Sequence, residues 1–241
     1  RLPATHNTGP LPWFIQAADS PAVIASGELA DVSELKQLAQ PAQRCQVTVA
    51  VPGQDAIIEQ VTLPGGARRH LNKVVPFALE EEVANDIETL LFAWPPADRS
   101  LTPLPVVVCA KSCMQQWQQW LSEAGIDADQ WVVDYLLLPY AENEWHCLQL
   151  GDEVLVRTGR WQGFTLEQGL LAQLPALLQN LGQSEDSLAR IVHYGPLSWP
   201  QAPAPLHSAD IEMPITALGL GEDGFDLRQQ QFKPKRKRQT Q

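Results

Sequence analysis

Alternating hydrophobic and polar positions predict two strands near the start of the chain. They cover residues 13–17 and 22–26 and flank the turn Asp19-Ser20-Pro21. In residues 31–38, which follow, hydrophobic side chains recur at the spacing of one helix face. The opening of the chain therefore predicts a hairpin and then a helix.

The next stretch predicts a small β-β-α-β subdomain. Residues 46–51 and 56–63 alternate as strands do and are separated by Pro52-Gly53, which favours a second hairpin. The pattern then becomes helical, and Pro76 removes an amide donor, so we expect a kink or break there. A strand over residues 89–94 closes the subdomain.

A β-α-β unit is predicted after a proline-rich linker. The linker covers residues 95–105, and the hydrophobic run 106–110 after it suits a buried strand. Residues 112–124 have helical spacing, and Gly125 is a good stop signal for that helix. Residues 131–138 are again strand-like.

The last part of the chain repeats this order. Gly151-Asp152 is a strong hairpin signal between two strand-like runs. The predicted elements are strands over 145–150, 153–158 and 162–166, a helix over 167–181, a strand over 189–194 and a loop over 196–205.

Both halves thus run through hairpin strands, a helix and a strand, the order of a ribonuclease H-like unit. Two such units in one chain predict an α/β fold of the actin-like ATPase architecture. The expected domains are residues 1–45 with 99–140 as the first unit, 46–98 as an inserted β-β-α-β subdomain, 141–232 as the second unit and 233–241 as a basic juxtamembrane tail.

Charge is distributed unevenly along the 241 residues. All 28 acidic residues lie at or before Asp226, whereas five basic residues crowd into the tail: Lys233, Lys235, Arg236, Lys237 and Arg238. Without these five, the chain carries 12 basic and 28 acidic side chains, a formal net charge of −16. Such a body repels nucleic acid and anionic lipid and favours a basic protein partner.

The chain contains no apolar run of the roughly 18 residues that a membrane-spanning helix needs, and its polar start lacks the apolar region of a signal peptide. We therefore expect this stretch to be soluble. Because it begins with Arg and not Met, we also expect further residues of the full protein to precede it, and a C-terminal continuation to follow.

Several kinds of chemistry lack support in the sequence. The four cysteines form no Cys-x-x-Cys pair and suit reduced structural thiols, and no two histidines have the spacing of a helical metal site. His146 and Cys147 are neighbours in a predicted strand, so one should be exposed and the other buried. Residues 219–224 match G-x-G-x-x-G, but their context and the acidic Glu222 and Asp223 favour a turn over a dinucleotide site.

A nucleotide site of the actin-like kind is also poorly supported. That architecture holds phosphates with two hairpins that carry Asp and Gly. Here the first hairpin offers Asp19 without a Gly, and the second offers Gly151 and Asp152 without a nearby Thr or Ser. We predict that the nucleotide site is lost and that no cofactor is bound. The alternative is an actin-like ATPase that still binds nucleotide through Asp19, Gly151 and Asp152.

An acidic segment follows the predicted helix around Pro76. It comprises Glu80, Glu81, Glu82, Asp86 and Glu88, with no basic residue among them. It is either a solvated face or a docking surface for a basic partner. A catalytic carboxylate pair is disfavoured, because nothing nearby would separate the two pKa values.

Three segments resemble a known family. They are the strand end Val61-Thr62-Leu63-Pro64, the run from Val75-Pro76-Phe77-Ala78-Leu79 through Glu80-Glu81-Glu82-Val83-Ala84, and Phe225-Asp226-Leu227-Arg228-Gln229 with Phe232 before the basic tail. Together they resemble the general secretion pathway protein L (GspL) family of the bacterial type II secretion system. The Pro-aromatic-x-Leu-Glu-Glu element is similar to one in PilM proteins. The family's late segment often has Asn-Leu-Leu-Gln-Gly where this chain has Asp226-Leu227-Arg228-Gln229-Gln230.

The resemblance implies a non-catalytic adaptor on the cytoplasmic face of the bacterial inner membrane. It implies that the chain recruits the secretion ATPase GspE through the N-terminal domain of that enzyme. Our own hypothesis is that the acidic segment and the exposed residues beside it form the contact. The resemblance further implies a transmembrane helix and a periplasmic domain beyond the basic tail, and contacts with GspM through regions outside this chain. A homodimer is left open, and no nucleic-acid partner is expected.

Overall fold

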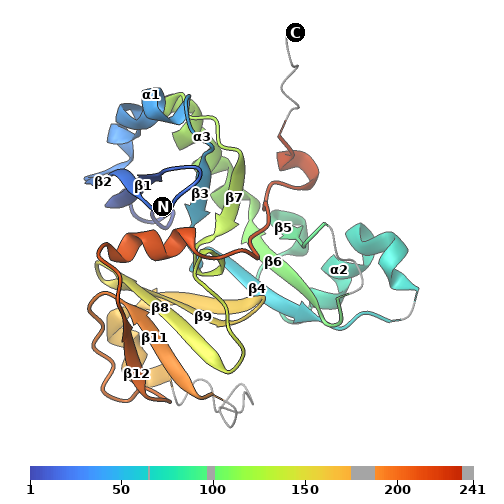
Figure 1. Cartoon of the computed structure of the whole chain (residues 1–241). Helices are drawn as coiled ribbons and strands as arrows, with labels where there is room; N and C mark the ends of the chain where they lie inside the picture. The colour runs from blue at the N-terminus through green and yellow to red at the C-terminus, as the bar shows by residue number, and fades with distance from the viewer. Residues whose placement is uncertain (65, 97–100, 175–187, 235–241) are drawn as a thin grey trace.

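The computed structural model describes residues 1–64, 66–96, 101–174 and 188–234. Its largest sheet has five strands in the order β10-β9-β8-β11-β12. The bounds are β8 (Glu144–Leu150), β9 (Glu153–Gly159), β10 (Gln162–Glu167), β11 (Arg190–Tyr194) and β12 (Leu206–Ala209). β8, β9 and β10 form an antiparallel meander, whereas β11 lies parallel to β8 and to β12. Figure 1 shows this sheet in yellow and orange at the lower left.

The predicted hairpin at Gly151-Asp152 is confirmed. Leu150 pairs with Glu153 across the turn, and Gly151 has the left-handed φ of 59° that a tight turn requires. β12 was not predicted, because it has only four residues, follows a proline-rich loop and has two polar residues, His207 and Ser208, in succession. Of the predicted helix over 167–181, residues 168–173 form the 3-10 helix η5 (Gln168–Gln173) and Leu174 is also helical, whereas residues 175–181 lie outside the described part of the chain.

Two pairs of strands come from the first part of the chain. β1 (Leu11–Gln16) and β2 (Val23–Leu29) form the predicted antiparallel hairpin, whereas β3 (Thr48–Val51) and β7 (Gln130–Val133) are parallel. Three helices accompany these strands: η1 (Val32–Leu38), α1 (Ala39–Ala42) and α3 (Lys111–Ala124). As predicted, α3 ends at Gly125, whose φ is 71°.

A third sheet has the order β4-β6-β5 and is antiparallel throughout. Its strands are β4 (Ala56–Val61), β5 (Leu90–Ala93) and β6 (Leu104–Ala110). The predicted hairpin between residues 46–51 and 56–63 is therefore wrong, because β3 and β4 belong to different sheets. The reason lies at Gly53, where a Cβ atom would come within 2.6 Å of Tyr135 and 2.8 Å of Thr165. Pro52-Gly53 allows this close approach and does not form a hairpin turn.

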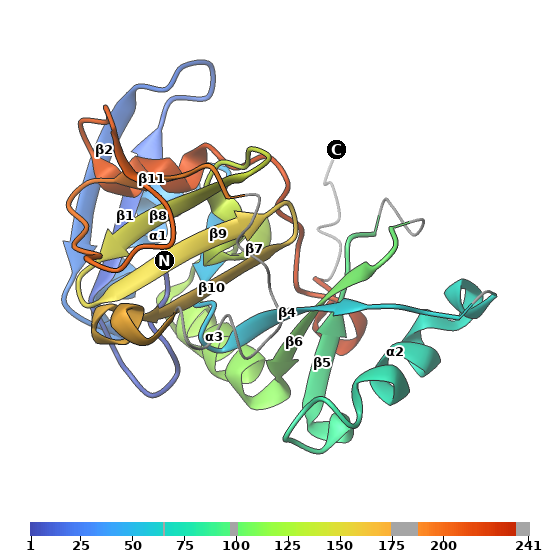
Figure 2. The same ribbon diagram turned by 90° about the horizontal axis from the view of Figure 1, so that it is seen from below.

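Helix α2 (Leu71–Leu79) follows the 3-10 helix η2 (Ala67–His70) and packs on this third sheet. Its buried residues are Leu71, Val75 and Leu79. The predicted break at Pro76 does not occur, because the helix continues for three residues beyond it and its buried face holds it against the sheet. Figure 2 shows α2 and the three strands as a lobe beside the larger sheet.

The predicted strand 131–138 ends at Val133 and continues as the 3-10 helix η4 (Asp134–Leu137). β6 and β7 flank α3 in the chain as predicted, but they pair in separate sheets. The remaining short helices are η3 (Ile87–Thr89), η6 (Pro214–Gly219) and η7 (Gln230–Phe232). The division of the chain into two units and an insertion stays a prediction.

Among the described residues, no helix has both the length and the apolar character needed to cross a bilayer.

Candidate functional site

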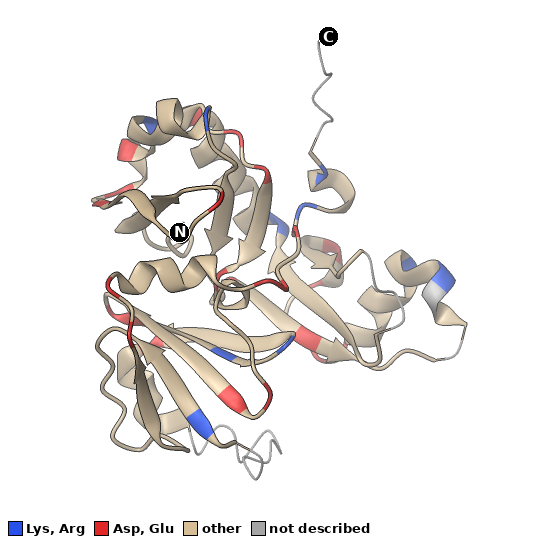
Figure 3. Ribbon diagram, in the orientation of Figure 1, with Lys and Arg blue, Asp and Glu red and all other residues tan. Residues whose placement is uncertain are grey.

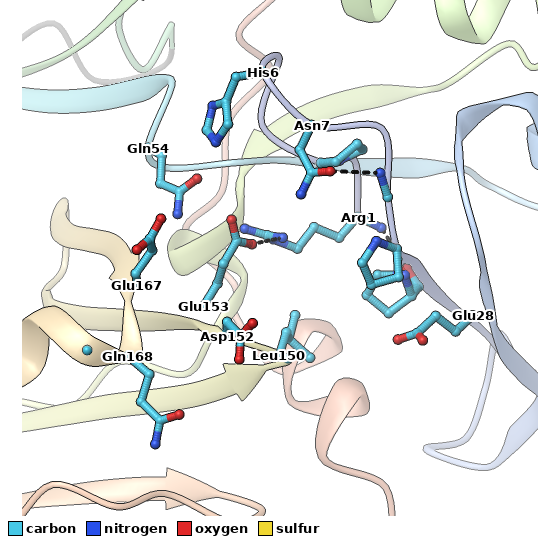
Figure 4. Close-up of a pocket in the computed structure, with 16 residues that line it drawn as sticks. Arg1, His6, Asn7, Glu28, Gln54, Leu150, Asp152, Glu153, Glu167 and Gln168 are labelled. Carbon is cyan, nitrogen blue, oxygen red and sulfur yellow. Dashed lines mark hydrogen bonds and ion pairs between the residues drawn. The ribbon is translucent and has the colours of Figure 1, made fainter.

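A cavity of about 470 Å³ lies where the N-terminal segment meets the turn between β8 and β9. One wall is formed by residues between Arg1 and Pro12, the other by residues 150–153 and 167–169. Figure 4 shows side chains from both walls directed towards one another. This cavity is where the predicted nucleotide hairpin at Gly151 and Asp152 is found.

The walls of this cavity carry more negative than positive side chains. Its four carboxylates are Glu28, Asp152, Glu153 and Glu167. The guanidinium of Arg1 is paired with Glu153 and, at 3.0 Å, with Asp134. Only the Nη2 atom of Arg1 has no hydrogen-bond partner among the described residues. The charge therefore disfavours a polyphosphate.

Asp134 is a fully buried carboxylate at the carboxyl end of β7. Besides Arg1, it accepts hydrogen bonds from Gly53 N at 3.1 Å and from Thr165 Oγ1 at 2.8 Å, and its own neighbour Tyr135 donates a backbone N–H at 2.7 Å. Burial raises the pKa of this carboxyl, and Arg1 and Thr165 act in the opposite direction. These donors come from the N-terminal segment, the start of the third sheet and β10, so Asp134 joins three parts of the fold.

Sequence reasoning missed Asp134, because a single Asp between hydrophobic residues carries no motif. Of the predicted nucleotide residues, Gly151 and Asp152 line the cavity, whereas Asp19 lies in the exposed turn between β1 and β2 and does not line it. The structure therefore brings two of those three residues together and leaves the third apart.

The acidic segment follows α2 directly. Glu80 to Glu82 form a turn after Leu79, and the side chain of Asp86 accepts a hydrogen bond at 2.9 Å from Glu88 N, where it caps η3. All five acidic side chains are exposed: Glu80, Glu81, Glu82, Asp86 and Glu88. None of them forms an ion pair with a side chain that the structure describes.

Two neighbours show how the acidic segment lies on the third sheet. Burial raises the pKa of Glu59 on β4, and the charge of Glu82 adds to this effect, so the segment passes close to β4. Phe77, near the end of α2, is 69% exposed. An exposed aromatic ring thus stands beside a run of free carboxylates. Figure 3 shows acidic positions in both lobes, and basic positions also in both, including the helical part of the lobe that contains α2.

The segment after η6 is held by specific contacts. Gly221 N donates to Leu137 O at 2.9 Å, and a Cβ atom on Gly221 would come within 2.6 Å of that backbone. Asp223 pairs with the buried Arg157 at 3.0 Å and with Arg160 at 3.1 Å. The element directly before the G-x-G-x-x-G run is the 3-10 helix η6 and not a strand, and no helix begins within the run, so its glycines serve packing.

Beyond Asp226 the segment binds β7 and β5. Leu227 is fully buried, and its N–H donates to Trp131 O at 2.9 Å. The Gln229 side chain donates to Trp94 O at 2.7 Å, and the Gln230 side chain donates to Phe92 O at 3.1 Å. Figure 1 shows the red C-terminal segment between β7 and the third sheet. Of the basic tail, only Lys233 lies within the described residues, where it is exposed.

The remaining candidate groups are a histidine and the cysteine thiols. His146 and Cys147 are both buried, so the prediction that one is exposed is wrong: β8 has a strand on each side and both of its faces are covered. The cysteines are free thiols. A hydrogen bond from Cys109 lowers the pKa of Cys113 to about 7. In the described residues no three His, Cys, Asp or Glu side chains are close enough to share a metal ion.

The fold is shared with proteins of known structure. The cytoplasmic domain of EpsL, an inner membrane component of the type II secretion system of Vibrio cholerae, matches with a TM-score of 0.81 and 27% identity over 95% of this chain and 96% of that one. A PilM-PilN type IV pilus biogenesis complex matches with a TM-score of 0.53 and 14% identity over 86% of each chain, which shows the fold alone. The protein is thus an α/β protein of the actin-like fold class, as the sequence predicts.

The family follows from the sequence comparisons. The model of the type II secretion system protein L family matches residues 1–235. Type II secretion system protein L of Vibrio cholerae is 32% identical over 177 residues, and that of Klebsiella pneumoniae is 32% identical over 199 residues, or 72% and 82% of this chain. The chain belongs to the type II secretion system protein L family. It spans 42% and 48% of the length of these two relatives.

Proposed function

We propose that the chain is a non-catalytic adaptor that recruits the secretion ATPase GspE to the inner-membrane platform. The observation that carries the proposal is the acidic segment: five exposed carboxylates in nine residues, none paired with a described side chain. A basic surface on the N-terminal domain of GspE would gain attractive charge contacts there, which favour both fast association and correct orientation.

The way α2 packs on the third sheet supports this role. The apolar face of α2 packs on the third sheet through Leu71, Val75 and Leu79, so the fold does not require the acidic side chains beyond it. Phe77 adds an exposed aromatic ring of the kind that anchors protein interfaces. Asp86 differs from the other four acids, because it caps η3.

Reversing two of these charges tests the proposal. We expect Glu81→Lys/Glu82→Lys to weaken binding of the GspE N-terminal domain about tenfold or more, because each replaces attraction with repulsion. The free energy of unfolding should change by about 0.5 kcal/mol or less, since both side chains are exposed. Isothermal titration calorimetry and thermal melting measure the two quantities.

The matched control is Glu142→Lys/Asp210→Lys, which changes net charge equally at exposed positions outside the lobe. It should bind GspE like the unmodified chain. Equal affinity of all three chains contradicts the acidic segment as the contact.

The runner-up function is nucleotide binding in the cavity between Arg1 and the β8–β9 turn. The position of Gly151 and Asp152 on the cavity wall favours it, and the four carboxylates around the cavity oppose it. The absence of catalytic activity is likewise our proposal.

A thermal shift with Mg²⁺ and ATP separates the two functions. A ligand at a hundredfold excess over its dissociation constant stabilises the folded state by about 2.7 kcal/mol. We expect no shift, because the cavity would place a polyphosphate among carboxylates. Magnesium chloride alone is the control, and an ATP-dependent rise in melting temperature contradicts the loss of the site.

The location and the other partners are proposed on the same basis. A cytoplasmic position suits the acidic body, and the basic tail from Lys233 to Arg238 suits the cytoplasmic side of a membrane-spanning helix beyond it. Contacts with GspM and the other platform proteins would then be made by regions outside this chain.

A further inference from the structure

Two cysteine thiols meet where β6 ends and α3 begins. Cys109 is the last residue but one of β6, and Cys113 is the third residue of α3. The chain turns between them, so that their side chains come together and the two thiols form a hydrogen bond. Their spacing is Cys-x-x-x-Cys, one residue longer than the Cys-x-x-Cys redox motif. The fold therefore forms a dithiol pair that the sequence motif does not reveal.

The two thiols differ in their access to solvent. Cys109 is 1% exposed and belongs to the main hydrophobic core, on the face of the third sheet that α2 does not cover. Cys113 is partly exposed at the start of its helix. A small reagent in solution can therefore reach Cys113, whereas the core shields Cys109.

Several groups favour the thiolate form of Cys113. The hydrogen bond from Cys109 has the largest effect and, with the hydroxyls of Thr5 and Ser112, lowers the pKa of Cys113 to about 7, although burial and the charge of Asp55 oppose this. The first turn of α3 is also a favourable place for a thiolate, because the N-terminus of a helix stabilises an anion. The same hydrogen bond raises the pKa of Cys109 well above its usual value. Cys113 is thus the nucleophile of the pair, and Cys109 stays a thiol.

Thr5 supplies a donor to Cys113 without giving up its own anchor. Its hydroxyl lies 3.5 Å from Cys113 Sγ and 3.1 Å from Asp55 Oδ2, and its backbone N–H donates to the same carboxylate oxygen at 2.7 Å. Since a hydroxyl has one proton, Thr5 can donate it to a Cys113 thiolate while the backbone N–H keeps Asp55 bound.

We propose that Cys113 and Cys109 form a peroxide-reactive dithiol, with Cys113 as the nucleophile and Cys109 as the resolving thiol. In the first step, the Cys113 thiolate attacks one oxygen of hydrogen peroxide. The O–O bond breaks, the sulfur becomes a sulfenic acid, and the other oxygen leaves as hydroxide, which takes up a proton.

In the second step, the Cys109 sulfur attacks the sulfenic sulfur of Cys113. The S–S bond forms as the S–O bond breaks, and the hydroxide that leaves takes the proton of Cys109 and becomes water. Two thiols thus lose two electrons in total, and one hydrogen peroxide is reduced to two waters.

The dithiol lies at a joint between two parts of the molecule. β6 is the central strand of the third sheet, whereas α3 packs against η1 in the first part of the chain (Figure 2). A disulfide from Cys109 to Cys113 would fix the turn from this sheet into the helix, and with it the lobe that carries the acidic segment. In the cytoplasm, where we have proposed that the chain lies, such bonds are transient and serve redox sensing.

Peptide mapping after oxidation tests the proposal on the chain of residues 1–241. The protein is treated with hydrogen peroxide at neutral pH, and the remaining thiols are blocked with N-ethylmaleimide. We expect a disulfide between Cys109 and Cys113 that dithiothreitol reverses. In Cys109→Ala, dimedone should trap the sulfenic acid of Cys113. In Cys113→Ser, oxidation of Cys109 should be at least about tenfold slower, because its thiol is buried and protonated.

Cys45→Ser is the matched control, because Cys45 is exposed and lies outside the pair. This variant should form the disulfide at the rate of the unmodified chain. Oxidation of Cys45 while Cys113 keeps its free thiol overturns the proposal, since exposure alone would then determine reactivity. Conversion of Cys113 to a sulfinic acid without a bond to Cys109 overturns it as well. The map of the unmodified chain decides between these outcomes even where a variant fails to fold.

Discussion

Replacing Asp134 with alanine is expected to cost about 3–5 kcal/mol of folding free energy, the usual penalty for removing one partner of a buried ion pair. The side chain of Arg1 is 3% exposed and would keep only Glu153 as a partner. Gly53 N and Thr165 Oγ1 would lose their acceptor in a site without solvent. Chemical denaturation followed by tryptophan fluorescence measures the loss.

Asp152→Ala is the matched control for this variant. Asp152 is the same residue type near the same cavity, but its side chain is exposed and caps nothing in the described structure. We expect a change within about 0.5 kcal/mol. If the two variants unfold at the same denaturant concentration, Asp134 does not hold the three parts of the fold together.

Arg157→Met is expected to have a similarly large effect, again about 3–5 kcal/mol. The guanidinium of Arg157 donates to four backbone carbonyls as well as to Asp223, and it is 1% exposed. Methionine fills much of the same volume but leaves those acceptors unpaired. Because Asp223 also loses its buried partner and keeps only the exposed Arg160, residues after Gly221 should become more sensitive to limited proteolysis.

Arg160→Met separates the buried from the exposed partner of Asp223. Arg160 pairs with the same carboxylate at 3.1 Å, but its side chain is 58% exposed, so we expect a loss below about 1 kcal/mol. Equal losses at positions 157 and 160 would show that the Asp223 ion pair, and not the set of backbone carbonyls, determines the stability.

Local signals predicted the regular elements well. The hairpins at Asp19 and at Gly151 and the helix ended by Gly125 depend on residues close together in sequence, and all three are present. The repeat of elements in the two halves predicted the actin-like fold class, because that order survives even where the strands end a few residues from their expected positions.

Pairing between distant segments could not be predicted in the same way. Pro52-Gly53 has the composition of a turn. Only the tertiary structure shows that a glycine is needed at position 53 because the side chains of Tyr135 and Thr165 approach its backbone closely. His146 was expected to alternate with Cys147, but the packing of helices and strands on both faces of β8 buries each of them. Pro76 was expected to kink or break a helix, and the helix that packs on the third sheet continues for three residues beyond it.

The candidate site was predicted only in part. The acidic segment was visible as a charge run, and its exposure is now established, while its role as a contact stays a proposal. Asp134 had no signal because its donors come from Arg1, Gly53 and Thr165, which are far apart in the sequence. A buried network of this kind becomes recognisable only when the chain has folded.

The attachment of the C-terminal segment determines how the domain would bear mechanical load. Tension applied beyond Lys233 would reach the buried Phe232 first, and then Gln230 and Gln229, whose side chains donate to Phe92 O on β5 and to Trp94 O just after it. It would next reach Leu227 on β7, and only then the link between Asp223 and Arg157. A pull would therefore be shared between the lobe that carries the acidic segment and the strands beside it before it strained the five-stranded sheet.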